Sequence, residues 1–228
     1  DGLEDMLADL RDDVVKTNRE YAKNLGIEQS VSTTCVKPSG TVSQLVDAAS
    51  GIHARHNPQY IRTVRADNKD PLCQFMKDQG FPAEACVMKP DNVTVFSFPV
   101  KAPENSVFRT DMTAIEQLEL WLKYQKFWCE HKPSVTITVK ENEWFDVGAW
   151  VWNNLDNISG ISFLPHSDHT YKQAPYQDCN IEEYEELLEK LPKDIDWTLL
   201  KNYEQEDNTA GSQTMACSGD SCEVVDLS

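Results

Sequence analysis

Two cysteines near the C-terminal end have the spacing of a redox-active pair. Cys217 and Cys222 lie in the sequence MACSGDSCE, with a glycine between them. A short spacer of this kind lets two sulfur atoms meet, so the pair could form and break a disulfide. Unpaired surface thiols and half of a zinc site are the alternatives, and zinc is disfavoured because no second pair has matching spacing. Asp220 and Glu223 disfavour a thiolate beside them, so the thiols are not strongly activated in place; a dithiol that reacts after docking elsewhere stays open beside unpaired thiols.

A turn rich in serine and glycine is the second candidate. Residues 37–43 read KPSGTVS and lie between a β-prone run and a helical pattern. Backbone N–H groups at the start of a helix can bind phosphate; Ser39 and Thr41 add hydroxyl donors, and Gly40 allows a ligand to approach closely. The spacing is not that of a Walker A loop, which argues against simple nucleotide hydrolysis. A turn that only caps a helix is the alternative.

A basic run follows this turn. Residues 51–65 (GIHARHNPQYIRTVR) contain three arginines and two histidines but no acid, in a chain of net charge −17. One interpretation is a site for an anionic ligand or a partner near the turn. The other is that Arg55, Arg62 and Arg65 pair with acidic side chains elsewhere.

A histidine-containing loop is predicted at residues 166–169, which read HSDH. Two imidazoles and a carboxylate could contribute to a metal site but are too few to complete one. An exposed loop is the simpler interpretation, and we expect no metal.

The composition limits the class of protein. With 228 residues, 40% of them apolar, the chain can form one large domain or two small ones. The net charge argues against a general nucleic-acid binder. No segment approaches the roughly 20 apolar residues of a membrane span, and a signal peptide is not evident. The odd total of seven cysteines, five of them scattered through predicted core segments, suggests a reducing compartment. We therefore expect a soluble, cytoplasmic protein without nucleic-acid or membrane partners. The sequence starts at Asp1, directly in a helical pattern, which suggests a fragment or processed product.

Hydrophobic periodicity predicts helices that alternate with strands. Gly26 should end the first helix, and two capping boxes, Thr113 with Glu116 and Asn180 with Glu183, should start later ones. We expect helices at 3–25, 41–49, 71–79, 113–130, 141–155 and 180–191, and strands at 31–36, 60–65, 92–98, 134–140 and 158–164. This alternation is typical of a mainly parallel α/β sheet or barrel. A closed parallel barrel needs about eight strands, so the chain would be part of a larger one.

Six segments together resemble the C-terminal part of the adenosylcobalamin-dependent (class II) ribonucleotide reductases, closest to the monomeric kind that acts on ribonucleoside triphosphates. In chain order they are residues 34–43 (TCVKPSGTVS), 51–65 (GIHARHNPQYIRTVR), 134–144 (SVTITVKENEW), 158–165 (ISGISFLP), 171–176 (YKQAPY) and 217–222 (CSGDSC). The segments follow the family's order over nearly the whole chain.

The resemblance implies a fold, a cofactor and an activity. Residues 1–200 would form the C-terminal part of a ten-stranded α/β barrel, with residues 161–164 near the adenosylcobalamin side, and residues 201–228 would be a flexible redox tail. The activity would be cobalamin-initiated thiyl-radical reduction of ribonucleotides to 2'-deoxyribonucleotides; triphosphate and diphosphate substrates stay open. The radical cysteine and the allosteric site would lie in the upstream part of the same reductase, so this part alone should be inactive.

The resemblance also implies residue roles. The turn formed by Pro38, Ser39, Gly40, Thr41 and Val42 would hold the substrate phosphates. The tail pair, Cys217 and Cys222, would reduce an active-site disulfide and be re-reduced by thioredoxin or a similar dithiol protein. The alternative function is a non-catalytic module that binds a phosphate ligand and has a redox-sensing tail.

Overall fold

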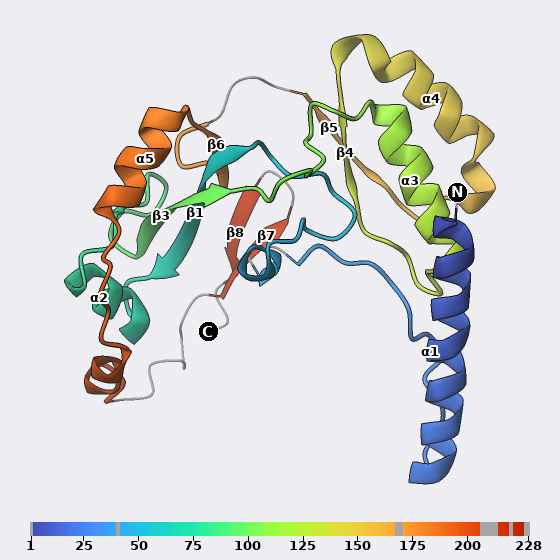
Figure 1. Cartoon of the computed structure of the whole chain (residues 1–228), viewed down its shortest axis with the longest axis horizontal. Helices are drawn as coiled ribbons and strands as arrows, with labels where there is room; N and C mark the ends of the chain where they lie inside the picture. Colours follow the sequence, from blue (N-terminus) through green and yellow to red (C-terminus); the bar gives the residue numbers. More distant parts are fainter. Residues whose placement is uncertain (1, 40–41, 167–170, 206–213, 219–220, 226–228) are drawn as a thin grey trace. The chain divides into compact units, whose positions relative to one another are not determined.

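The chain folds into two compact units (Figure 1). The computed structural model describes residues 2–39, 42–166, 171–205, 214–218 and 221–225. The first unit consists of residues 1–55 and 103–167, and the second of residues 56–102 and 168–228. Both units mix helices and strands, which confirms the α/β class.

The first unit contains a short parallel strand pair with two helices beside it (Figure 1). Its helices are α1 (Leu3–Leu25), α3 (Ala114–Phe127) and α4 (Trp144–Asn153), its strands are β4 (Thr136–Val139) and β5 (Ser162–Pro165), and short 3-10 helices are η1 (Val42–Val46), η2 (Glu141–Glu143) and η3 (Leu155–Asn157). Strand β4 pairs with β5 from Thr136 opposite Ser162 to Val139 opposite Pro165. A parallel pair needs a crossover connection, which here includes α4.

The core of the first unit lies between α3 and the strand pair. Leu118, Trp121 and Ile137 are fully buried there. The indole N–H of Trp121 donates to the carbonyl of Pro133 at 3.2 Å, so the largest core side chain leaves no polar atom unsatisfied. The prediction that the apolar face of the 113–130 helix enters a core is confirmed, as is the capping box of Thr113 and Glu116.

Helix α1 ends where the sequence predicts. Gly26 has a φ of 69°, in the left-handed region that favours glycine. The N–H of Gly26 donates to the carbonyl of Lys23, and that of Ile27 donates to Ala22, so two of the last carbonyls of the helix are satisfied. The helix packs against α3, with Lys123 Nζ 3.3 Å from Glu4 Oε1.

The second unit is built on an antiparallel sheet in the order β2-β3-β1-β6. Its elements are β1 (Gln59–Asp67), α2 (Pro71–Asp78), β2 (Ala83–Ala85), β3 (Val93–Lys101), β6 (Tyr176–Asp178), α5 (Ile181–Lys190), η4 (Trp197–Asn202), β7 (Thr214–Ser218) and β8 (Ser221–Val225). Helix α5 begins at the predicted capping box of Asn180 and Glu183. Figure 1 shows α5 beside β1 and β3.

The expectation of a mainly parallel sheet is wrong for the second unit. Strands β1 and β3 run antiparallel, from Gln59 opposite Lys101 to Asp67 opposite Val93. Alternating helices and strands predict parallel pairing only if each helix crosses over the sheet to start the next strand on the same side. Here the chain after β1 turns through α2 and re-enters beside β1 in the opposite direction.

The predicted strand at 31–36 and helix at 41–49 are also wrong. Residues 31–36 have no regular secondary structure and pair with no strand among the described residues; Val31 is 99% exposed, whereas Thr34 is buried. In place of the helix there is the five-residue 3-10 helix η1. Within the described residues, no helix is both long and apolar enough to cross a membrane.

Candidate functional site

The predicted phosphate turn is exposed, but its described amides are already used. Ser39 donates its N–H to Ser50 Oγ at 3.0 Å, and Val42 donates its N–H to the carbonyl of Ser39 at 3.2 Å. Gly40 and Thr41 lie outside the described residues. The premise of a strand-to-helix turn is therefore wrong, whereas phosphate binding by this segment stays a prediction.

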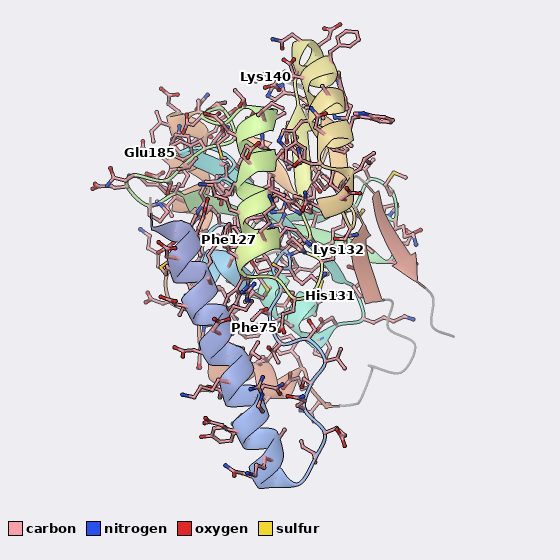
Figure 2. All side chains as sticks on the ribbon, turned by 90° about the vertical axis from the view of Figure 1, so that its right-hand side faces the viewer. Phe75, Phe127, His131, Lys132, Lys140 and Glu185 are labelled. Carbon is pink, nitrogen blue, oxygen red and sulfur yellow. The ribbon has the colours of Figure 1, made fainter. Side chains whose placement is uncertain are left out.

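Lys37 anchors the segment that enters the turn. Its ammonium group donates to the carbonyl of Lys132 at 3.0 Å and to Ser134 Oγ at 3.1 Å. Lys132 and His131 lie in the turn after α3, beyond its last residue Phe127 (Figure 2). Since its charge points into this contact, Lys37 positions the backbone and is not directed at a ligand.

A cavity of about 240 Å³ adjoins the turn within the first unit. Ser50 connects the two features, because its hydroxyl accepts from Ser39 and its carbonyl accepts from the N–H of His53, which lines the cavity. The cavity wall consists of residues 47, 49, 53–55 and 103–107. It combines the cationic Arg55 with the acidic Asp47 and Glu104, so it is not a purely cationic site.

His53 has a positioning role. The backbone N–H of Thr136 donates to Nε2 of His53 at 3.0 Å, and Nδ1 lies 2.6 Å from the carbonyl of Ser50. Because a backbone N–H can only donate, Nε2 is the acceptor and Nδ1 carries the proton. Both ring nitrogens are thereby used to hold the 50–53 loop on β4.

The basic run mainly supports the fold. Arg55 is only 4% exposed, and its backbone bonds to Val107 and Arg109. In the second unit, Arg62 donates to the carbonyl of Pro175 and Arg65 to that of Gln173, each at 2.9 Å. These two side chains bind backbone carbonyls, and both an anion site and acid pairing stay predictions.

His56 extends the same support in the second unit. Its Nε2 lies 2.7 Å from Asp178 Oδ1, which also accepts from Asn57 at 2.7 Å. Its ring stacks on Tyr176, with centroids 5.5 Å apart. These contacts join the start of β1 to the end of β6.

The histidine loop is only partly described. The N–H of His166 donates to the carbonyl of Val139 at 2.7 Å, which extends the β4-β5 pair. Ser167, Asp168 and His169 lie outside the described residues. In the described part of the chain, no group of three or more His, Cys, Asp or Glu side chains is placed to hold a metal ion.

The tail cysteines occupy opposed backbone positions. Strands β7 and β8 pair antiparallel with Cys217 directly opposite Cys222. A backbone register that places two cysteines opposite each other is compatible with a disulfide.

The other five cysteines are free thiols in different environments. Cys35 is exposed, Cys179 is partly exposed, and the remaining three are buried. Burial raises the pKa of Cys129 to about 11. Burial also acts to raise the pKa of Cys86, but hydrogen bonds from the backbone of Lys89 and Met88 and from Arg65 outweigh it, so that pKa falls below its usual value.

Two residues that support the turn or the segment before it were missed by the sequence analysis. Ser50 supports Ser39, and Glu130 Oε2 accepts from the N–H and the hydroxyl of Thr33, each at 2.8 Å. These hydrogen bonds lower the pKa of Glu130. No local pattern connects residues almost one hundred positions apart, so only the folded chain brings Glu130 to Thr33.

Comparisons with known proteins agree on one family. The adenosylcobalamin-dependent ribonucleoside-triphosphate reductase of Euglena gracilis is 34% identical over 173 residues, which are 75% of this chain and 24% of that protein. The enzyme of the same name from Lactobacillus delbrueckii subsp. bulgaricus is 31% identical over 216 residues, 92% of this chain and 29% of its own. The chain therefore spans less than a third of the length of these relatives. A search of family models finds no match.

A solved structure extends this similarity to the fold. The crystal structure of a B12-dependent (class II) ribonucleotide reductase superposes on 89% of this chain with a TM-score of 0.72 and 28% identity. The match covers 29% of that structure. The resemblance inferred from the six sequence segments is confirmed.

Proposed function

Because the chain belongs to the family of adenosylcobalamin-dependent ribonucleoside-triphosphate reductases, we propose that it is the substrate-phosphate and electron-relay part of such an enzyme. The whole enzyme would reduce ribonucleoside triphosphates to 2'-deoxyribonucleotides. Similarity over 92% of the chain to one such enzyme is the observation that carries this proposal. In this assignment residues 1–200 contribute to the wall of a ten-stranded barrel, and residues 201–228 form a redox tail.

The turn of residues 38–42 is assigned to the substrate phosphates. Ser39 is exposed, and Ser50, which holds its amide, also links the turn to the neighbouring cavity. A phosphate oxygen can accept a hydrogen bond from the hydroxyl of Ser39 without any rearrangement. It can also accept from the backbone N–H of Ser39, if the phosphate replaces Ser50 Oγ as the acceptor of that N–H. Binding then exchanges one hydrogen bond for another and leaves no buried amide unsatisfied.

Adenosylcobalamin does not fit within the described residues alone. The cavity of about 240 Å³ is below the roughly 300–1,000 Å³ of pockets for drug-sized ligands, and a cobalamin is larger than such ligands. When bound to the complete enzyme, the cofactor supplies radical initiation. We assign no residue of this chain to it, and the steps below involve only this chain's own groups.

The tail pair is assigned to electron delivery. A thiolate of Cys217 or Cys222 attacks an oxidised active-site disulfide, which releases one active-site thiol and forms a mixed disulfide. The second tail cysteine attacks that bond and releases the other thiol, so two electrons and two protons pass to the active site. A thioredoxin-type dithiol then reduces the tail disulfide and is itself oxidised. The opposed backbone positions of the two cysteines support this role.

Reconstituted turnover tests the proposal. The chain would be joined to the upstream part of the same reductase, and deoxynucleotide formation would be measured with adenosylcobalamin, a ribonucleoside triphosphate and a dithiol. We expect turnover from the joined protein and none from the upstream part alone. Full activity without this chain would contradict the assignment. The alternative of a non-catalytic phosphate-binding module is not favoured, because the relatives over nearly the whole chain are reductases.

A further inference from the structure

A second pair of cysteines lies together in the first unit. Cys35 and Cys129 are far apart in the sequence, but both neighbours of Cys129 are hydrogen-bonded to the segment that carries Cys35. The indole N–H of Trp128 donates to the carbonyl of Cys35 at 3.2 Å, and Glu130 donates its N–H to the carbonyl of Thr34 at 3.0 Å. The chain segments that carry the two cysteines are thus held side by side.

Further contacts fix this arrangement at both ends. Ser134 donates its N–H to the carbonyl of Val36 at 2.9 Å, and the carboxylate of Glu130 binds Thr33 and Thr34. The N–H of Val36, the residue after Cys35, lies near the sulfur of Cys129 and acts on it. One thiol therefore lies close to the peptide bond that follows the other cysteine, and Cys35 is near enough to act on the pKa of Cys129.

The two thiols differ in access. Cys35 is exposed, whereas Cys129 is only 9% exposed. Burial raises the pKa of Cys129 to about 11; the Val36 N–H lowers it, the nearby Cys35 raises it and Lys37 lowers it. An external disulfide can therefore reach Cys35 first, and Cys129 is the protected partner that can react next.

We propose that Cys35 and Cys129 form a second redox-active pair, which closes to a disulfide on exposure to a small oxidised disulfide such as that of glutathione. The site is distinct from the tail pair and does not depend on the proposed reductase activity. The shuttle role of Cys217 and Cys222 does not require a disulfide between Cys35 and Cys129.

The reaction balances as two thiol exchanges. The thiolate of Cys35 attacks the small disulfide, so a mixed disulfide forms and one small thiol leaves. Cys129 then loses its proton and attacks the sulfur of Cys35, which releases the second small thiol. The chain loses two electrons and two protons, and the small disulfide gains them. Because Cys129 must lose its proton, this second step accelerates as the pH rises toward the pKa of Cys129.

Peptide mapping after oxidation tests the proposal. The full chain with Cys217→Ser and Cys222→Ser would be treated with glutathione disulfide, blocked with an alkylating agent without reduction, digested and analysed by mass spectrometry. We expect two of the five remaining thiols to be lost, with Cys35 and Cys129 in one cross-linked peptide pair that dithiothreitol separates. Cys73 and Cys86 are 1% and 3% exposed, so they should stay reduced in the same sample.

Single variants test the order of the two steps. Cys129→Ser should accumulate glutathione on Cys35, Cys35→Ser should leave Cys129 reduced, and Cys179→Ser should form the cross-link like the parent chain. A stable glutathione adduct on Cys35 with Cys129 intact would overturn the proposal. Cross-links from Cys35 to Cys73, Cys86 or Cys179 in amounts similar to Cys129 would also overturn it, because they would show that the pairing is not specific.

Discussion

Gly51 lies so close to Lys37 that a Cβ atom on Gly51 would stand 3.2 Å from the carbonyl oxygen of Lys37. The same atom would lie 3.3 Å from Cγ1 of Val36, and Gly51 has a φ of 60°. The basic run and the segment that enters the phosphate turn therefore meet at a position where a side chain is disfavoured by both backbone conformation and space. The glycine links two segments that the sequence analysis treated separately.

Replacement of this glycine should destabilise the first unit. Gly51→Ala places a side chain in the left-handed region and against a backbone oxygen that cannot move freely, at a cost of about 1–3 kcal/mol. Urea unfolding measures this loss. Gly148→Ala in α4 is the matched control, since a Cβ there meets nothing within 4 Å and alanine favours a helix interior by up to about 1 kcal/mol. Equal stability of the two variants would contradict the close contact at Gly51.

Glu130 should make stability depend on pH in the acid range. Hydrogen bonds from Thr33 and Thr34 lower the pKa of Glu130 in the folded chain. The carboxylate therefore adds stability that is fully present above the pKa of the unfolded chain, near about 4.3, and is lost as the pH falls through the lower folded pKa. Glu130→Gln should be less stable than the parent at pH 7, and this difference should shrink as the pH is lowered below about 4.

Urea unfolding of both proteins over a pH series checks this expectation. Glu185→Gln is a charge-matched control, because Glu185 lies exposed on α5 in the other unit (Figure 2). It should leave the acid dependence close to that of the parent. A constant difference between Glu130→Gln and the parent from pH 7 to pH 3 would argue against the hydrogen bonds of Glu130 as its cause.

Ser39 should matter for the substrate and little for the fold. Its side chain is exposed, so Ser39→Ala removes a hydroxyl donor without opening a cavity. If that hydroxyl binds a phosphate oxygen, its loss costs about 1–2 kcal/mol, or roughly 5–30-fold in substrate affinity. In the complete reductase, the KM for ribonucleoside triphosphate should rise by this factor with kcat nearly unchanged. Ser32→Ala, an exposed serine before the turn, should have no effect; an unchanged KM in Ser39→Ala would remove this residue from the phosphate site.

The predictable part of the fold is the local part. Helix caps depend on residues within one turn of helix, so the sequence reveals them directly. Examples are the capping boxes at Thr113 and Asn180 and the glycine cap at Gly26. The direction of β1 against β3 depends on how a connection of more than twenty residues returns, and periodicity carries no signal for that. Residues 31–36 have the side chains of a strand but lack the partner strand.

The site follows the same division. Ser39 and the tail cysteines are recognisable from their sequence context. Ser50 supports Ser39, and Glu130 binds Thr33, through contacts that only the fold creates. The phosphate turn was predicted from a strand and a helix that the structure lacks, so phosphate binding by this segment stays a prediction. The pairing of Cys35 with Cys129 has no sequence signature, because it depends on how the chain after α3 meets residues 33–36.

Removal of the two tail cysteines should block reduction of the enzyme by thioredoxin but not by a small dithiol. Because Cys217 and Cys222 are opposed in the β7-β8 register, serine at both positions abolishes disulfide formation there while it preserves side-chain size. In the complete reductase, the double variant should make about one deoxynucleotide per enzyme with thioredoxin, since its reduced active site serves a single turnover and cannot be regenerated through the tail. Dithiothreitol should sustain turnover, because a small dithiol can reach an active-site disulfide directly.

The control variant is Cys179→Ser, which removes a thiol outside both proposed pairs and should keep thioredoxin-coupled turnover. Normal turnover of the double variant with thioredoxin would refute the relay.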